Sequence, residues 1–325
     1  MNAQDPLEHK AAIHVAAAAI LDGKGRVLIS KRHDHVHQGG LWEFPGGKLE
    51  AGETVLAGLT RELQEELDIQ LLRSEPLIKI THHYPDRSVL LDVHRVLEFA
   101  GEPRGMEGQP LRWQLPAAMQ TAEFPAADRP IITALQLPDL YLITGADATR
   151  PVEFLQRLEA ALQRGLSMVQ FRAHELTDSA YNHLAEAALD ICRRYRARLL
   201  LNRPSRLLSW ADGVHLTRHQ LAVCRERPQV SGWVGASCHD LHELRQAQRL
   251  GLDYALLSPV LPTLSHPDAT PLGWKRFAEW VEQVNLPVYA LGGVGLEDLD
   301  EAKQSGAQGI AAISAFWAYQ DPPKP

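Results

Sequence analysis

Gly47-Lys-Leu-Glu-Ala-Gly-Glu53, followed closely by Arg61-Glu-Leu-Gln-Glu-Glu66, is the stretch that decides the fold of the first part of this chain. Glu62, Glu65 and Glu66 stand at positions i, i+3 and i+4, so a helix places their carboxylates on one face. Such repelling carboxylates are tolerated either in water or around a hard divalent cation. Because Mg²⁺ takes oxygen ligands and binds substrate phosphates, the stretch predicts the chemistry of a diphosphate hydrolase.

The bulk composition indicates an ordinary globular protein. The 325 residues suffice for two domains with full cores, and 45% of them are hydrophobic and 22% charged. A net charge of −7 argues against a general nucleic-acid-binding surface, although a pocket for free nucleotides needs only local positive charge. The three cysteines are widely spaced and form no zinc or disulfide pattern, so we expect a cytoplasmic protein.

The apolar run Ala11–Leu21 is the one early segment that resembles a signal or membrane sequence. It is too short to span a bilayer, contains His14, and is followed at once by the turn Asp22–Gly25. We interpret it as a buried strand and expect no association with a membrane.

Residues 11–137 predict a mixed α/β unit. The expected strands are Ala11–Leu21, Arg26–Lys31, Leu77–His82 and Ser88–Phe99, and the expected helices are Thr54–Leu67 and Ala127–Leu137. A loop rich in His and Gly, at 33–40, precedes the acidic segment.

The pattern changes after Pro138, where short apolar runs alternate with amphipathic stretches. The runs are Tyr141–Thr144, Met168–Arg172, Leu199–Asn202, Gly213–Leu216, Val234–Ser237, Tyr254–Ser258, Val288–Leu291 and Ile310–Ser314. Near-continuous apolar strands in this number are typical of a (β/α)₈ TIM barrel. The sequence therefore predicts an α/β protein with domains at 1–137 and 138–325.

The first domain resembles the Nudix hydrolases. The pattern Gly-x5-Glu-x7-Arg-Glu-Leu-x-Glu-Glu is the Nudix box, and Asp68 replaces its usual glycine at the end of the helix. Further segments are similar to the MutT branch, including Trp42–Gly47, Tyr84–Arg87, Glu107–Pro110 and Phe124–Pro130. The resemblance implies an α/β/α sandwich with a mixed sheet, and an 8-oxo-dGTP diphosphatase that releases the monophosphate and pyrophosphate.

The resemblance also implies roles for individual residues. Glu62, Glu65, Glu66 and the Gly46 carbonyl would hold Mg²⁺, with Mn²⁺ as an alternative metal. Either Glu62 or Glu107 would act as the general base, and the sequence does not choose between them. Arg61 would pair with Glu53 and orient the helix, while Arg32 would clamp a phosphate.

Base recognition is implied for the residues before the box. The positions expected to contact substrate are Arg32, His37, Glu43, Phe44, Pro45, Gly46 and Asp128. MutT relatives usually carry Asn at position 128, and Asn both donates and accepts hydrogen bonds, whereas ionised Asp only accepts. A zinc tract at His33, His35 and His37 is the alternative to a loop beside the nucleotide.

The second domain resembles thiamine-phosphate synthase and its TenI-like relatives over residues 139–318. The resemblance rests on segments such as Val169–Arg172, Asp212–Leu216, Leu257–Thr263 and Ala290–Gly293. It implies a phosphate site at Gly292, Gly293, Ile313 and Ser314. Other barrel ligand positions implied in this way are Gln170, Arg172, Asn202, Ser237, Thr263 and Ser265.

The second domain also departs from both families. Asn202-Arg203 replaces the Asn-Asp that binds Mg²⁺ in the synthases, and no acid stands at His219-Gln220. His174 and His266 replace expected lysines, and Ser258-Pro259 stands where the TenI type has its histidine. A phosphate-ligand binding barrel, or an altered enzyme of thiamine metabolism, fits these changes better than either activity.

Three functional hypotheses follow. The first is a nucleotide-pool diphosphatase that removes oxidised guanine nucleotides, with a barrel that binds thiazole phosphate or another thiamine precursor. The second directs the hydrolase against a thiamine-pathway diphosphate, with the barrel supplying or receiving the product as a bifunctional synthase. The third makes the barrel a non-catalytic sensor that regulates the hydrolase.

Overall fold

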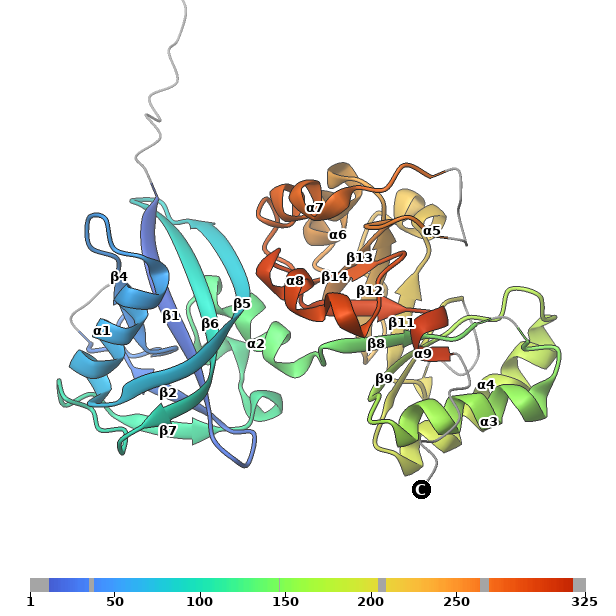
Figure 1. Cartoon of the computed structure of the whole chain (residues 1–325), viewed down its shortest axis with the longest axis horizontal. Coiled ribbons are helices and arrows are strands. Elements are labelled where there is room, and N and C mark those ends of the chain that lie inside the picture. Colours follow the sequence, from blue (N-terminus) through green and yellow to red (C-terminus); the bar gives the residue numbers. More distant parts are fainter. Residues whose placement is uncertain (1–11, 35–37, 146, 204–208, 264–268, 318–325) are drawn as a thin grey trace, which may run out of the picture. The chain divides into compact units, whose positions relative to one another are not determined.

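The structure is a computed structural model that describes residues 12–34, 38–145, 147–203, 209–263 and 269–317. The chain divides into two compact units, one ending at Gln136 and the other starting at Leu137 (Figure 1). No helix among the described residues is long and apolar enough to cross a membrane.

A mixed sheet forms the centre of the first unit (Figure 1). Its strands are β1 (Ile13–Leu21), β2 (Val27–Lys31), β3 (Trp42–Glu43), β4 (Gly46–Lys48), β5 (Gln70–His83), β6 (Ser88–Ala100) and β7 (Leu111–Gln114). The order is β3-β2-β1-β6-β5, with β4 paired to β1 and β7 paired to β2. Among the described strands of this sheet, only β1 and β6 pair in parallel.

Alternation along β1 explains why this sheet is covered on both faces. Ala16, Ala18 and Ile20 share a core with the apolar side of α1 (Val55–Leu67). Ala17 and Ala19 point the other way and share a core with α2 (Arg129–Gln136). The predicted α/β/α sandwich with a mixed sheet is confirmed.

Local signals fix the ends of α1. The Thr54 side chain accepts a hydrogen bond from the Ala57 amide and caps the start of the helix. Asp68 ends the helix in the left-handed conformation, with φ 55° and ψ 40°, at the position where the Nudix box usually has glycine. Asp tolerates this conformation, so the helix ends as a glycine would end it.

Several expected boundaries were wrong. β5 starts at Gln70, well before Leu77, because its pairing with β6 shifts register several times and breaks the apolar alternation. The expected helix Ala127–Leu137 divides into a 3₁₀ turn, Ala126–Asp128, and α2. The short strands β3, β4 and β7 carry too few residues to show a period, and the sequence did not predict them. Two more 3₁₀ turns, Pro116–Ala118 and Thr121–Glu123, precede Phe124.

The second unit is a closed parallel barrel of eight strands, as predicted (Figure 1). The strands are β8 (Leu140–Ile143), β9 (Met168–Phe171), β10 (Arg198–Leu201), β11 (Gly213–Leu216), β12 (Trp233–Cys238), β13 (Tyr254–Leu257), β14 (Val288–Leu291) and β15 (Gly309–Ala312). The helices are α3 (Pro151–Gln163), α4 (Asp178–Arg194), α5 (Arg218–Val223), α6 (Leu241–Arg249), α7 (Gly273–Val281), α8 (Leu299–Gln304) and α9 (Ser314–Trp317). A 3₁₀ turn at Leu296–Asp298 precedes α8.

A hydrogen-bonded set of polar side chains lies in the barrel interior. The Tyr254 hydroxyl lies 2.9 Å from the Tyr141 hydroxyl and 3.1 Å from His215 Nδ1, and His215 Nε2 lies 3.0 Å from Ser237 Oγ. Burial lowers the pKa of His215 to about 3, so the ring is neutral and pairs with its neighbours. His215 therefore has a structural place inside the barrel.

Candidate active site

The turn at Gly46-Gly47 brings the acidic face of α1 against β4. A Cβ atom on Gly47 would lie 2.2 Å from the carboxyl carbon of Glu62, so only glycine lets that carboxylate sit there. The Gly46 amide donates a hydrogen bond to Glu66 Oε2 over 3.2 Å. The backbone of the glycine turn and two of the predicted metal ligands therefore meet at one place.

Arg61 forms hydrogen bonds with three of the carboxylates beside the Gly46-Gly47 turn. Its Nε and Nη2 donate to the two carboxylate oxygens of Glu53, over 3.1 and 3.0 Å, and Nη2 also donates to the Lys48 carbonyl. Nη1 lies 2.9 Å from Glu62 Oε1 and 3.2 Å from Glu65 Oε2. Arg61 thus ties the middle of α1 to β4 through Lys48 and to the preceding turn through Glu53, and the pair with Glu53 is the one that the Nudix resemblance implied.

The structure does not bring all predicted ligands equally close. Glu62 is 14% exposed, whereas the Glu65 side chain is 61% exposed and turned toward Arg61. Glu107 approaches through a loop that docks on the end of α1, where the Met106 amide and the Gln109 side chain both donate to the Glu66 carbonyl.

These carboxylates concentrate negative charge around Glu66. Burial raises the pKa of Glu66 to about 8, and the nearby charges of Glu43, Glu62 and Glu107 raise it further, while the hydrogen bond from Gly46 opposes the shift. No three His, Cys, Asp or Glu side chains in the described part of the chain already form a group that could hold a metal ion. The donors are nevertheless oxygen atoms of several acidic side chains gathered at one place, which fits a hard divalent cation.

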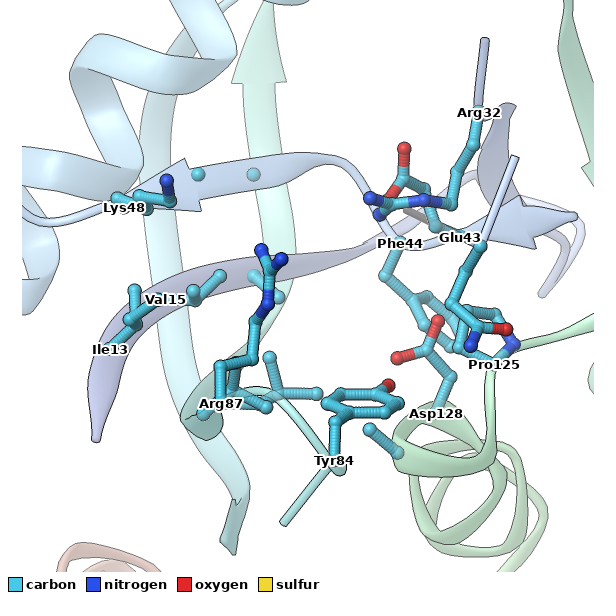
Figure 2. A pocket seen from close by; sticks show the side chains of 17 residues that line it. Ile13, Val15, Arg32, Glu43, Phe44, Lys48, Tyr84, Arg87, Pro125 and Asp128 are labelled. Atoms are coloured by element: carbon cyan, nitrogen blue, oxygen red, sulfur yellow. The ribbon is translucent and has the colours of Figure 1, made fainter. Parts of the chain in front are cut away.

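A cavity of about 260 Å³ adjoins the glycine turn (Figure 2). Its wall includes Gly46, Gly47, Lys48, Arg32, Glu43, Phe44, Tyr84, Arg87, Pro125 and Asp128. Because the turn belongs to both the cavity wall and the acidic cluster, a ligand in the cavity can place phosphates beside the carboxylates.

Basic side chains stand at two parts of this wall. Arg32, the expected phosphate clamp, forms an ion pair with Glu43, and Figure 2 shows their charged ends together. Lys48 and Arg87 lie nearer the β4 end, and the Arg87 guanidinium also pairs with Asp86. Sequence reasoning assigned no role to Lys48 or Arg87; the MutT-like segment Tyr84–Arg87 was the signal that could have identified Arg87.

Asp128 closes the other end of the cavity. It is 8% exposed, and Figure 2 shows its carboxyl group facing the Tyr84 ring. Burial raises its pKa to about 8, the Glu43 charge adds to the shift, and Arg32 opposes it. The carboxyl group is therefore largely protonated at neutral pH and can donate as well as accept a hydrogen bond.

Phe44 is both a core residue and part of the cavity wall. It is buried, and its ring stacks on Phe124 with 5.9 Å between centroids. Pro45 donates no amide hydrogen, and its carbonyl accepts from the Ala18 amide across the sheet. His37 and the middle of the proposed zinc tract lie outside the described residues, whereas the adjacent Gln38 lines the cavity.

The predicted ligand residues of the second unit gather at the carboxyl ends of its strands, which form one rim because all strands are parallel. Arg172, Asn202 and Thr263 follow β9, β10 and β13, Gly292-Gly293 follows β14, and Ile313-Ser314 follows β15. Gly292 and Gly293 have φ values of 93° and 72°, which favour glycine. Ser265 and His266 lie outside the described residues.

Comparisons with known proteins agree with this division. A thiamine monophosphate synthase family model matches residues 140–316, and a NUDIX domain model matches residues 16–134. An Aquifex aeolicus protein named "Putative thiamine-phosphate synthase 2" is 40% identical over 188 residues, which cover 56% of this chain and 99% of that protein. A Synechococcus "Thiamine-phosphate synthase" is 36% identical over 195 residues, 58% of this chain and 55% of that protein.

Solved structures of MutT proteins are similar to the first unit. One, from work on the Aliivibrio salmonicida and Vibrio cholerae proteins, shares 35% identity and covers 38% of this chain and 96% of its own, with a TM-score of 0.33. The chain spans about half the length of the Synechococcus relative and nearly all of the Aquifex one. The chain belongs to the thiamine monophosphate synthase family and carries a NUDIX domain ahead of the family's barrel.

Proposed function

We propose that the NUDIX domain hydrolyses 8-oxo-dGTP and related nucleoside triphosphates to the monophosphate and pyrophosphate, with Mg²⁺ as cofactor. The observation that carries this proposal is the meeting of Glu62 and Glu66 at the Gly46-Gly47 turn, at the edge of a cavity. Hydrolysis of a phosphorus anhydride is the general activity of the domain, and the nucleotide is the specific part of the proposal.

The carboxylates would act together with the bound metal. Mg²⁺ would neutralise phosphate charge and lower the pKa of a bound water. Glu62, Glu66 and the Gly46 carbonyl would hold it, and Glu65 would join by turning from its exposed position. Glu62 or Glu107 would take the proton from the attacking water.

Basic groups on the wall would hold the phosphates in place. Lys48 and Arg87 line the β4 end of the cavity, beside the turn against which the carboxylates of α1 lie. A phosphate chain that crosses this end would lie between the basic side chains and the acidic cluster. Arg32 would orient the nucleotide from the opposite side, where Glu43 holds its guanidinium.

Asp128 would form hydrogen bonds with the edge of the base. Relatives of the MutT type usually have Asn there, and a protonated carboxyl group offers the same pair of one donor and one acceptor. The buried position of Asp128 beside Glu43 therefore supports recognition of an oxidised guanine despite the change from Asn.

The barrel would bind a phosphorylated ligand of the thiamine pathway, such as thiazole phosphate. Family membership and the glycine turn after β14 support this part of the proposal. The same membership favours a second candidate, in which the NUDIX domain hydrolyses a thiamine-pathway diphosphate. It also favours a third, in which the barrel acts as a sensor that regulates the hydrolase.

A substrate panel separates these candidates. The value of kcat/KM would be measured for 8-oxo-dGTP, dGTP and a hydroxymethylpyrimidine diphosphate, with and without thiazole phosphate. The proposal expects 8-oxo-dGTP to be the best substrate. A preference of about 100-fold for the pyrimidine diphosphate, equivalent to about 2.7 kcal/mol of transition-state binding, would replace it with the second candidate.

A further inference from the structure

The barrel rim beside β10 and β11 is the place where the family resemblance implies a Mg²⁺ ion. The two strands pair in parallel, so the segments that follow them start from neighbouring positions on the rim. Arg203 follows β10, and Gln220 belongs to α5, which follows β11. Neither residue offers the carboxylate that a hard divalent cation prefers.

The Arg203 side chain is held in place by contacts with α4 and with the loop that precedes it. Its guanidinium lies 4.0 Å above the centre of the Tyr181 ring, and Nη1 and Nη2 each donate to the Leu176 carbonyl over 3.2 Å. Nη2 also donates to the Thr177 carbonyl and lies 3.4 Å from an Asp178 oxygen. The side chain therefore holds the connection between β9 and α4 against the end of β10.

Gln220 is also engaged locally. Its Oε1 accepts from the Thr217 amide over 2.8 Å, and its own amide donates to Thr217 Oγ1 over 3.3 Å, which forms a capping box at the start of α5. The neighbouring acids Asp240 and Glu243 are paired with Arg218. These two carboxylates, which lie near the start of α5 through Arg218, are thus already paired with an arginine.

The positive charges near the end of β9 also disfavour a divalent cation at this rim. Burial lowers the pKa of His174, and the positive charges of Arg172 and Arg203 lower it further, while Glu175 opposes them. A field that disfavours a proton on His174 also disfavours a divalent cation beside it. The residues present therefore do not fit the metal that the fold family implies.

Two buried polar atoms nevertheless indicate a ligand. Gln170 and Asn202 lie on the neighbouring strands β9 and β10 and are 4% and 2% exposed. Each stands two residues beyond an interior residue, Met168 or Leu200, so both side chains point into the barrel near the rim. Gln170 Nε2 and Asn202 Oδ1 have no hydrogen-bond partner, and together they offer one donor and one acceptor.

We infer that this barrel binds a phosphate monoester with a hydrogen-bonding ring, without a divalent cation, and that Arg203 is a positioning residue that takes the place of the metal site. A diphosphate is excluded because its additional negative charge would need the cation. Backbone carbonyls already use both Nη groups of Arg203, and the single donor left without a partner, its buried Nε, does not replace a divalent cation. This inference rests on the proposed binding of a phosphorylated ligand by the barrel. It also excludes a synthase reaction at this site, because that reaction needs a diphosphate and its Mg²⁺.

Hydrogen–deuterium exchange of the full chain, followed by mass spectrometry, tests the inference because it reports on barrel peptides separately from the NUDIX domain. The probes are inorganic phosphate and inorganic pyrophosphate, each with Mg²⁺ or with EDTA. We expect phosphate to slow exchange in peptides that cover 172–178 and 291–295 equally in both conditions. Pyrophosphate with Mg²⁺ should add no protection.

Protection that needs Mg²⁺, or that is stronger with pyrophosphate and Mg²⁺, would overturn the inference, and so would the absence of protection by either probe. The paired variant Arg203→Asp with Gln220→Asp should gain protection by pyrophosphate that depends on Mg²⁺. A folded paired variant without that gain would contradict the assignment of these positions. Hydrolysis of 8-oxo-dGTP, measured on the same protein preparations in Mg²⁺ without phosphate, pyrophosphate or EDTA, shows independently whether the proposed NUDIX activity holds.

Discussion

The amide nitrogen of Gly46 lies 3.2 Å from Oε2 of Glu66, so the glycine turn and the acidic face of α1 are joined by a hydrogen bond. This contact places a buried carboxylate at the edge of the cavity, where the cation and the phosphates of a substrate would meet.

Gly47→Ala should disturb the active site more than the fold. The new Cβ would lie 2.2 Å from the Glu62 carboxyl carbon, so that carboxylate must move away from the turn. We expect kcat to fall by about 10- to 100-fold, the range typical when groups that orient a metal ligand are lost, with little change in Tm. Gly23→Ala is the control, because a Cβ there has no atom within 4 Å; equal activity of the two variants would contradict the placement of Glu62.

Glu65→Gln should abolish most turnover although its side chain is exposed. The ion pair with Arg61 that holds it outward is on the surface and contributes at most about 1 kcal/mol, so a bound cation can draw the carboxylate inward. The measurement is kcat at saturating Mg²⁺ together with the far-ultraviolet circular dichroism spectrum. Full activity in a folded variant would remove Glu65 from the proposed metal ligands.

Arg61→Lys should weaken the site while keeping its charge. A lysine cannot make the two parallel hydrogen bonds to the Glu53 carboxylate, so the helix loses its link to the preceding turn. We expect kcat/KM to fall about 10-fold or more, in line with lost positioning of metal ligands. A variant with unchanged kinetics would show that the bidentate contact has no positioning role.

Base selectivity should depend on pH through Asp128. Because its pKa is raised to about 8, the carboxyl group loses its donor hydrogen as pH rises through that value. The ratio of kcat/KM for 8-oxo-dGTP to that for dGTP should therefore fall above pH 8 in the wild-type protein. Asp128→Asn keeps its donor and should keep the ratio constant; a parallel fall in both proteins would assign the effect to another group.

The same residue gives a prediction for stability. A carboxyl group whose pKa is raised from 3.8 to about 8 keeps its proton in the folded state while the unfolded state loses it, so the free energy of unfolding falls as pH rises between those values. Asp128→Asn removes this loss. Urea denaturation should show a more stable variant at and above pH 8, with the difference shrinking toward pH 3.8; a constant difference would contradict the shifted pKa.

The sequence predicted the parts of the site that depend on spacing along one helix. Glu62 and Glu66 share a face because of helical geometry, and Thr54 and Asp68 carry local signals for the start and end of that helix. The barrel was also predicted from local sequence, because each of the eight apolar runs is one buried strand.

Features that depend on distant segments could not be predicted in this way. Lys48 reaches the cavity wall from β4, Tyr84 and Arg87 reach it from the turn between β5 and β6, and no local pattern links these two segments. The protonation of Asp128 depends on burial and on Glu43 from another strand. The contacts of Arg203 are not local either, since its position over Tyr181 follows from packing between β10 and α4.

The most direct measurement of the central claim is the turnover of 8-oxo-dGTP by Glu66→Gln and by the wild-type chain at saturating Mg²⁺. The substitution keeps the size of the side chain and removes the carboxyl group that would ionise and bind the cation beside the Gly46-Gly47 turn. We predict a loss in kcat of at least about 100-fold, because even groups that only support a metal ligand cost 10- to 100-fold. A folded Glu66→Gln protein with wild-type turnover would contradict the account.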